Sequence, residues 1–122
     1  MATKYVSDGN VINWTNGTGS AVSSGDVVAT GHCIGVALVD IADGATGSVA
    51  VEGVFTLPKV SAAVFTQGEK LIWDASASAF DDSAATPATG DITGGAVAWI
   101  AGANTETTCT VKLTPGNATK TA

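Results

Sequence analysis

The stretch DIADGATGSVAVEGVFTLPK, residues 40–59, joins a glycine-rich turn to a long apolar segment that ends at a proline. From residue 48 to residue 57 the apolar side chains alternate, which predicts a β-strand with one buried face. Gly53 interrupts the apolar row and predicts a bend, such as a barrel corner. Pro58 has no amide hydrogen, so regular strand pairing should end there or lie on an exposed edge.

The neighbouring segments predict partners for this strand. An apolar run over residues 34–41 leads into the turn at residues 42–47, which favours a hairpin with the strand at 48–57. Upstream, GDVV at residues 25–28 is a turn followed by a strand, and GEKL at residues 68–71 repeats that order. This match suggests an internal duplication. The alternative is coincidence, because every β-domain reuses the same turn and strand chemistry.

The second half of the chain predicts another hairpin. Residues 96–101 and 107–113 flank a polar turn at 102–106, and Cys109, Val111 and Leu113 share one face. Between the halves, residues 74–95 are too rich in helix breakers for a helix, and predict a long ordered loop excursion pinned by Trp73 and Phe80.

These segments predict an all-β fold: a small β-barrel or sandwich of short antiparallel strands. We expect an extended N-terminal arm at residues 1–20, one β-barrel domain at 21–114 that includes the excursion at 74–95, and a flexible tail at 115–122.

Composition argues against several function classes. The net charge is −6 and the chain has no arginine, whereas nucleic-acid binding needs clustered cations, so we expect no nucleic-acid partner. No apolar run approaches the ~18 residues of a transmembrane helix, and no signal peptide is visible at the N-terminus. We therefore expect no membrane partner and synthesis in the cytoplasm.

Candidate chemical groups are few and scattered. Cys33 and Cys109 match no metal or redox spacing and predict buried free thiols, with a disulfide formed after release as the alternative. His32 and Cys33 are neighbours that would point to opposite faces of a strand. The aspartates of residues 40–43 and 81–82 fit turns better than a calcium loop or an acid/base pair. We therefore predict no enzyme activity and no cofactor.

Three stretches resemble one family. They are TKYVSDGNVINWT at residues 3–15, IGVALVDIADGATGSVAVEGVFTLPK at 34–59, and QGEKLIWDAS at 67–76. They resemble the phage and prophage capsid decoration proteins, also called head cement proteins. The resemblance implies a small β-barrel on the outer surface of a mature phage head, which clamps neighbouring major capsid subunits, commonly as a homotrimer at local threefold positions, without a cofactor.

A binding mechanism follows as a hypothesis. The N-terminal arm would add an extended strand to a sheet edge of a capsid subunit. The residues assigned to this arm are Thr3, Lys4, Tyr5, Val6, Val11, Ile12 and Trp14. Apolar loop residues around Trp73 and Phe80 would contact a second protomer or the capsid. The alternative for the arm is a β-strand that completes its own domain, because Val11, Ile12 and Trp14 are apolar enough for a core.

A function of another class also fits the composition. Fibre and adhesin modules that recognise a cell-surface ligand are often acidic and rich in Thr, Gly and Ala. The absence of a visible signal peptide and the small number of aromatic residues argue against this alternative.

Overall fold

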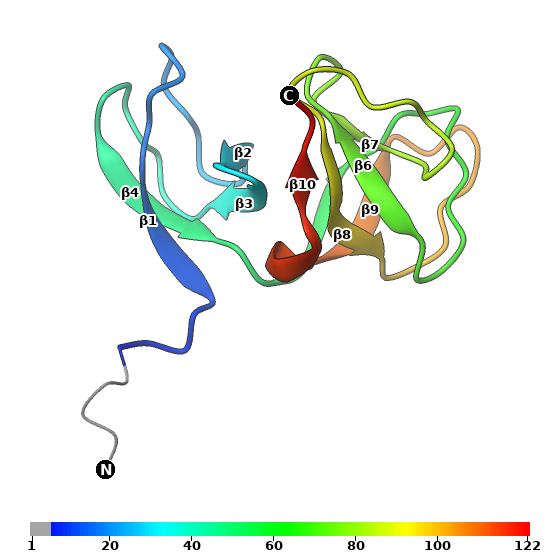
Figure 1. Ribbon diagram of the computed structural model, residues 1–122, viewed down its shortest axis with the longest axis horizontal. Helices are drawn as coiled ribbons and strands as arrows, with labels where there is room; N and C mark the ends of the chain where they lie inside the picture. Colours follow the sequence, from blue (N-terminus) through cyan, green and yellow to red (C-terminus); the bar gives the residue numbers. More distant parts are fainter. Residues whose placement is uncertain (1–5) are drawn as a thin grey trace.

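The computed structural model describes residues 6–122, and its regular structure is almost entirely antiparallel β-sheet. The first of its two sheets has four strands in the order β1-β4-β3-β2 (Figure 1). Its strands are β1 (Val11–Thr15), β2 (Val27–Thr30), β3 (Cys33–Ala37) and β4 (Thr46–Ala50).

The second sheet has six strands, with the order β5-β9-β8-β6-β7 and with β10 paired to β8. Its strands are β5 (Gly53–Pro58), β6 (Lys70–Asp74), β7 (Ala79–Asp81), β8 (Ile92–Ala98), β9 (Thr108–Leu113) and β10 (Thr119–Lys120). The sheets do not close into a barrel, so the fold is sandwich-like, the second of the two architectures that the sequence predicted.

The segment at residues 48–57 is not one bent strand, as the sequence predicted, but the parts of two strands in different sheets. β4 ends at Ala50 and β5 begins at Gly53, so the chain crosses between the sheets at residues 51–52 (Figure 1). Gly53 has φ +128°, a conformation that L side chains rarely adopt. The sequence predicted a bend at Gly53. In the structure, this glycine begins a new strand in the other sheet.

Both predicted hairpins are present. β3 pairs with β4 through Val36 and Ala50, and β8 pairs with β9 through Ala98 and Val111. Cys109, Val111 and Leu113 are all buried, as their alternation predicted.

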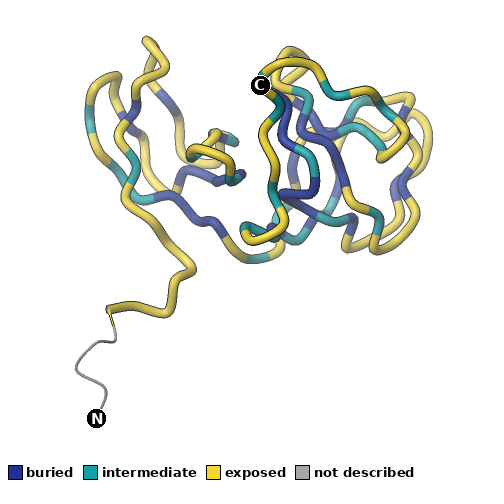
Figure 2. The backbone as a smooth tube through the Cα atoms, viewed as in Figure 1, coloured by how far each residue is buried: buried dark blue, intermediate teal, exposed yellow. Residues whose placement is uncertain are grey.

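The two sheets share the larger of two apolar clusters. Ile34 and Val36 of β3 pack in the same cluster as the buried side chains of the second sheet, whose strands carry much of the buried chain in Figure 2. A Cβ atom on Gly95 of β8 would lie 2.7 Å from the Cδ1 atom of Ile34, so glycine allows these strands to approach. A smaller cluster lies within the first sheet and consists of Val22, Val28, Ala37, Ile41 and Val49.

The predicted excursion at residues 74–95 contains a strand that the sequence did not reveal. β7 forms a hairpin with β6, and Trp73 pairs with Phe80 in its register. The buried Asp91 carboxylate holds the rest of this region, because it accepts hydrogen bonds from the amides of Ala75 and Ala88 at 3.1 Å and 2.9 Å. Residues 75–91 therefore form the β6-β7 turn, β7 and a loop, while residues 92–95 of the predicted excursion belong to β8.

The C-terminal residues 115–122, which the sequence assigned to a flexible tail, form a short turn and a strand of the second sheet. A 3-10 turn, Pro115–Asn117, leads into β10, and Thr119 pairs with Thr93 of β8. The amide of Thr121 continues this contact by donating to the carbonyl of Asp91 at 2.8 Å. Backbone pairing of this kind needs no apolar side chains, so the polar sequence gave no sign of it.

The strand orders of the two sheets are equivalent. The order β1-β4-β3-β2 of the first sheet matches β5-β9-β8-β6 of the second, with β7 as an insertion in the second half. Gly25 donates its amide hydrogen to Ala37 and Gly68 donates to Ala98, each at 2.7 Å. Both glycines have positive φ, 93° and 84°. The duplication suggested by the sequence is thus present as a structural repeat.

Within residues 6–122, no helix is long and apolar enough to span a membrane.

Candidate interaction surface

The described part of the predicted arm contains an edge strand of the first sheet. Thr3, Lys4 and Tyr5 lie outside the described residues. Val6 is 92 % exposed, and Val11 and Ile12 of β1 are each 47 % exposed. Trp14 is half-buried against the smaller cluster. The arm thus combines an exposed segment with a strand that belongs to its own domain, which is the alternative that the sequence left open for residues 11–15.

The outer edge of β1 is open to a further strand. The carbonyl of Asn10 accepts from Val51 and the amide of Asn16 donates to Ala45, so the backbone groups of even-numbered residues face β4. Since backbone groups alternate in direction along a strand, those of Val11, Asn13 and Thr15 face away from β4. β1 occupies the end of the sheet order, so no strand among residues 6–122 pairs with this edge.

Trp73 and Phe80 lie in the core rather than on a contact surface. Trp73 is 7 % exposed and Phe80 is fully buried. Their ring centroids are 5.0 Å apart with planes at 67°, an edge-to-face arrangement that stabilises the β6-β7 hairpin. The rings therefore hold the β6-β7 hairpin from inside the domain.

The sequence did not identify most of the exposed apolar side chains. The large apolar residues exposed outside the arm are Leu38, Val39, Val54, Val64, Trp99 and Ile100. Two adjacent pairs, 38–39 and 99–100, lie directly after the ends of β3 and β8. Their exposure could not be predicted from the sequence, because both pairs continue the apolar runs of buried strands.

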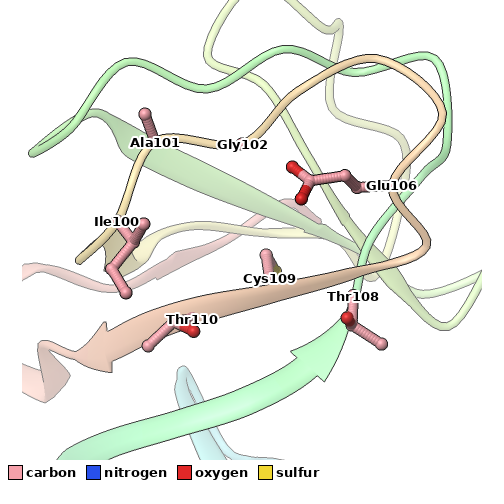
Figure 3. Close-up of a pocket in the computed structure, with 7 residues that line it drawn as sticks. All are labelled: Ile100, Ala101, Gly102, Glu106, Thr108, Cys109 and Thr110. Atoms are coloured by element: carbon pink, nitrogen blue, oxygen red, sulfur yellow. The ribbon is translucent and has the colours of Figure 1, made fainter.

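A small hollow of about 130 Å³ lies beside the second pair (Figure 3). The loop after β8 forms one side with Ile100, and β9 forms the other with Thr110. Burial raises the pKa of the Cys109 thiol in this hollow to about 11, although the nearby ammonium of Lys59 lowers it. The thiol is therefore protonated at neutral pH and is a poor nucleophile.

The Lys59 side chain is buried beneath the same region. Its ammonium donates to the carbonyls of Val60, Ser61 and Glu106 at 3.0, 3.2 and 3.3 Å. It also lies 5.4 Å from the ring centroid of Phe65. Carbonyl dipoles and an aromatic face thus stabilise the buried charge.

The acidic side chains that the sequence assigned to turns do bind turn amides. Asp40 accepts from the amide of Ser24 at 2.8 Å, and Asp43 accepts from Gly19 at 3.1 Å. Hydrogen bonds from the hydroxyl of Ser76 and nearby amides hold the pKa of Asp74 below its usual value. Among residues 6–122 no group of three or more His, Cys, Asp or Glu residues could hold a metal ion.

Both cysteines are free thiols, Cys109 buried and Cys33 half-buried. The imidazole of His32 accepts a hydrogen bond from the amide of Lys120 at 3.3 Å. His32 and Cys33 thus contact different parts of the C-terminal segment, since the Cys33 thiol is 3.7 Å from the carbonyl of Pro115.

The described residues thus form a small β-domain with an open sheet edge and paired apolar residues at the surface, features of a protein that acts by binding another protein. The family comparison agrees with this class. The chain belongs to the phage cement protein family, whose model matches residues 6–113. The family's role is structural and associated with the phage capsid. No curated protein and no solved structure gave a significant match to this chain.

Proposed function

We propose that this protein binds the outer surface of a mature phage head and stabilises contacts between neighbouring major capsid subunits. The family match over residues 6–113 is the observation that carries the proposal. The net charge of −6 supports it, because acidic copies repel each other in solution and associate less before they reach the head.

In the proposed mechanism the N-terminal arm contacts the capsid by strand addition. Residues 6–10 precede β1, and the open edge of β1 presents backbone donors and acceptors beside them. Val6, Val11 and Ile12 supply exposed apolar side chains to such a contact. Thr3, Lys4 and Tyr5 belong to the same proposed segment, and Trp14 anchors it to the domain.

We also propose that the protein assembles as a homotrimer at local threefold positions of the head. A trimer that touches several capsid subunits gains avidity even when each contact is weak. Cryo-electron microscopy of decorated heads tests this arrangement directly. Density for three copies around each local threefold axis is expected, whereas single copies at other positions would contradict the trimer.

The role of the arm is tested by deleting residues 2–10, which leaves β1 and its pairing with β4 in place. The matched control keeps the length of the arm but replaces residues 2–10 with a Gly-Ser sequence. Both variants should unfold at the temperature of the unaltered chain and bind expanded, undecorated heads more weakly in a cosedimentation assay. Undiminished binding by either folded variant would contradict capsid binding by the arm.

A further inference from the structure

The structural repeat extends beyond strand order to individual side chains. Before β2, the carboxylate of Asp26 accepts a hydrogen bond from the amide of Ser23 at 3.0 Å. Before β6, the carboxylate of Glu69 accepts one from the amide of Thr66 at 2.9 Å. The two turns therefore share a side-chain cap, and they precede β2 and β6, which hold equivalent places in the strand orders of the two sheets.

The repeat places the pairs of exposed apolar residues in equivalent positions. The amide of Leu38 donates to Ser48 of β4, and the amide of Trp99 donates to Thr110 of β9, each at 3.0 Å. We call Leu38 with Val39 the first rim pair, and Trp99 with Ile100 the second rim pair.

Side chains from the preceding turns hold both pairs in the same way. The hydroxyl of Ser24 donates to the carbonyl of Leu38, and the side-chain amide of Gln67 donates to the carbonyl of Trp99, each at 3.2 Å. Ser24 and Gln67 each stand one residue before the repeated glycine. The two pairs are therefore fixed by one common arrangement of turn, strand end and neighbouring strand.

All four rim side chains are substantially exposed. Leu38 and Val39 are 43 % and 47 % exposed, and Trp99 and Ile100 are 48 % and 57 % exposed. Folding of the domain does not require large apolar side chains at exposed positions, since their exposure to water is unfavourable. The side chains of the two pairs differ in size, while their apolar character and exposure are repeated.

We infer that the two rim pairs are equivalent docking surfaces, and that each binds the same segment of one of two neighbouring capsid subunits. This inference rests on the proposed function. A symmetric shell presents one segment repeatedly at a fixed spacing. A chain with two equivalent halves fits two such copies at once, because the packing of β3 against β8 fixes the distance between its rim pairs.

Charge indicates the chemistry of the docked segment. Asp40 follows the first rim pair, and Glu106 lines the hollow beside Ile100 of the second. Both acidic residues are exposed. An apolar segment flanked by Lys or Arg would bury its apolar side chains on each rim pair and place its cations near these carboxylates. At the second pair the ammonium of Lys112 already lies 5.4 Å from the ring centroid of Trp99, so the partner cation would lie on the Ile100 side, near Glu106.

Crosslinking tests whether the two surfaces bind the same segment. A photoreactive phenylalanine analogue is placed at residue 38, 99 or 64 of separate full-length chains, which are then bound to expanded, undecorated heads and irradiated. Residues 38 and 99 should crosslink to one common stretch of the capsid subunit, identified by mass spectrometry. Crosslinks to two unrelated stretches would overturn the inference.

Position 64 is the matched control for crosslinking. Val64 is 57 % exposed, but the equivalent position in the first half is the exposed Ala21, so a large apolar side chain is not repeated there. It should not crosslink to the common stretch. The same stretch captured from position 64 would show nonspecific proximity and would overturn the inference as well.

Affinity tests whether both surfaces are needed. The variants L38S/V39S and W99S/I100S each retain one rim pair, and each should bind heads about 10²- to 10⁴-fold more weakly through loss of avidity. V64S should bind like the unaltered chain. Equal binding by the unaltered chain and either rim variant would contradict two-site docking, while failure of the unaltered chain to bind any head would overturn the proposed function itself.

Discussion

Asn16 and Lys59 occupy equivalent positions at the ends of β1 and β5, and each buries a polar side chain that donates to backbone carbonyls. Asn16 is fully buried and Lys59 is 4 % exposed. The backbone amide of Asn16 donates to the carbonyl of Ala45, and the backbone amide of Lys59 donates to the carbonyl of Thr107, each at 2.8 Å. Both halves therefore attach their first strand through a buried polar residue. One half uses a neutral amide and the other a charged ammonium.

The Asn16 side chain should contribute measurably to stability. Its amide group donates to the carbonyls of Ser20 and Ile41 at 2.7 Å and 3.0 Å, and its side-chain oxygen accepts from the backbone amide of Thr18, so N16A removes these three hydrogen bonds. We expect the free energy of unfolding in urea to fall by about 1–3 kcal/mol. The control N13A changes an exposed residue of the same strand and should stay within about 0.5 kcal/mol. Equal effects of the two substitutions would contradict a specific role for Asn16.

Gly53 should be required where the chain passes from one sheet to the other. Its φ of +128° is unfavourable for alanine, and an added Cβ atom would lie 3.2 Å from the ring of Phe55. We expect G53A to lower the free energy of unfolding by about 1–3 kcal/mol. G17A is the matched control, because a Cβ atom at Gly17 meets nothing within 4 Å. A G53A protein as stable as G17A would show that the crossing tolerates another backbone conformation.

Local patterns predicted the parts of this fold that depend on neighbouring residues. The alternation of Cys109, Val111 and Leu113 identified a buried strand face, and the GDVV and GEKL turns identified the repeat. A bend was predicted at Gly53 because this glycine interrupts an apolar row where a side chain would be expected. Each of these signals lies within a few residues of the structure that it specifies.

The features that the sequence did not reveal depend on distant partners. Alternation continues across residues 48–57 because Val51 is buried at the crossing, so one strand could not be distinguished from two. β7 and β10 are short strands whose pairing depends on β6 and β8. In the sequence, Leu38 and Trp99 resemble core residues because they continue the apolar runs of buried strands. They are exposed because β3 and β8 end one residue before them.

Glu69 should stabilise the second half in a pH-dependent way. Burial alone would raise the pKa of its carboxyl group, but hydrogen bonds from Ser83 and Thr66 outweigh burial and hold the pKa below 4.5. Because the folded pKa is lowered, this contribution is present above the unfolded pKa and is lost as the pH falls through the folded value. E69Q should lower the free energy of unfolding by about 1 kcal/mol at pH 7. The difference from the unaltered protein should shrink below pH ~4, and a difference that does not depend on pH would contradict the carboxylate's role.

The raised pKa of Cys109 gives a prediction at the alkaline end. Burial raises the pKa of this thiol from 9.0 to about 11, against the opposing effect of Lys59. In a C33S background, which leaves Cys109 as the one cysteine, alkylation of the folded protein by iodoacetamide should be slow at pH 8 and accelerate toward pH 11.

Stability should follow the same titration. Because the unfolded thiol ionises first, the contribution of protonated Cys109 is complete below pH 9 and is lost as the pH rises through about 11. The variant C33S/C109A should lack this part of the alkaline decline in urea unfolding experiments, while C33S retains it. K59M removes the ammonium that lowers the thiol pKa, so in the same background it should move the alkylation profile to still higher pH. An unchanged or downward-shifted profile would contradict the assigned effect of Lys59.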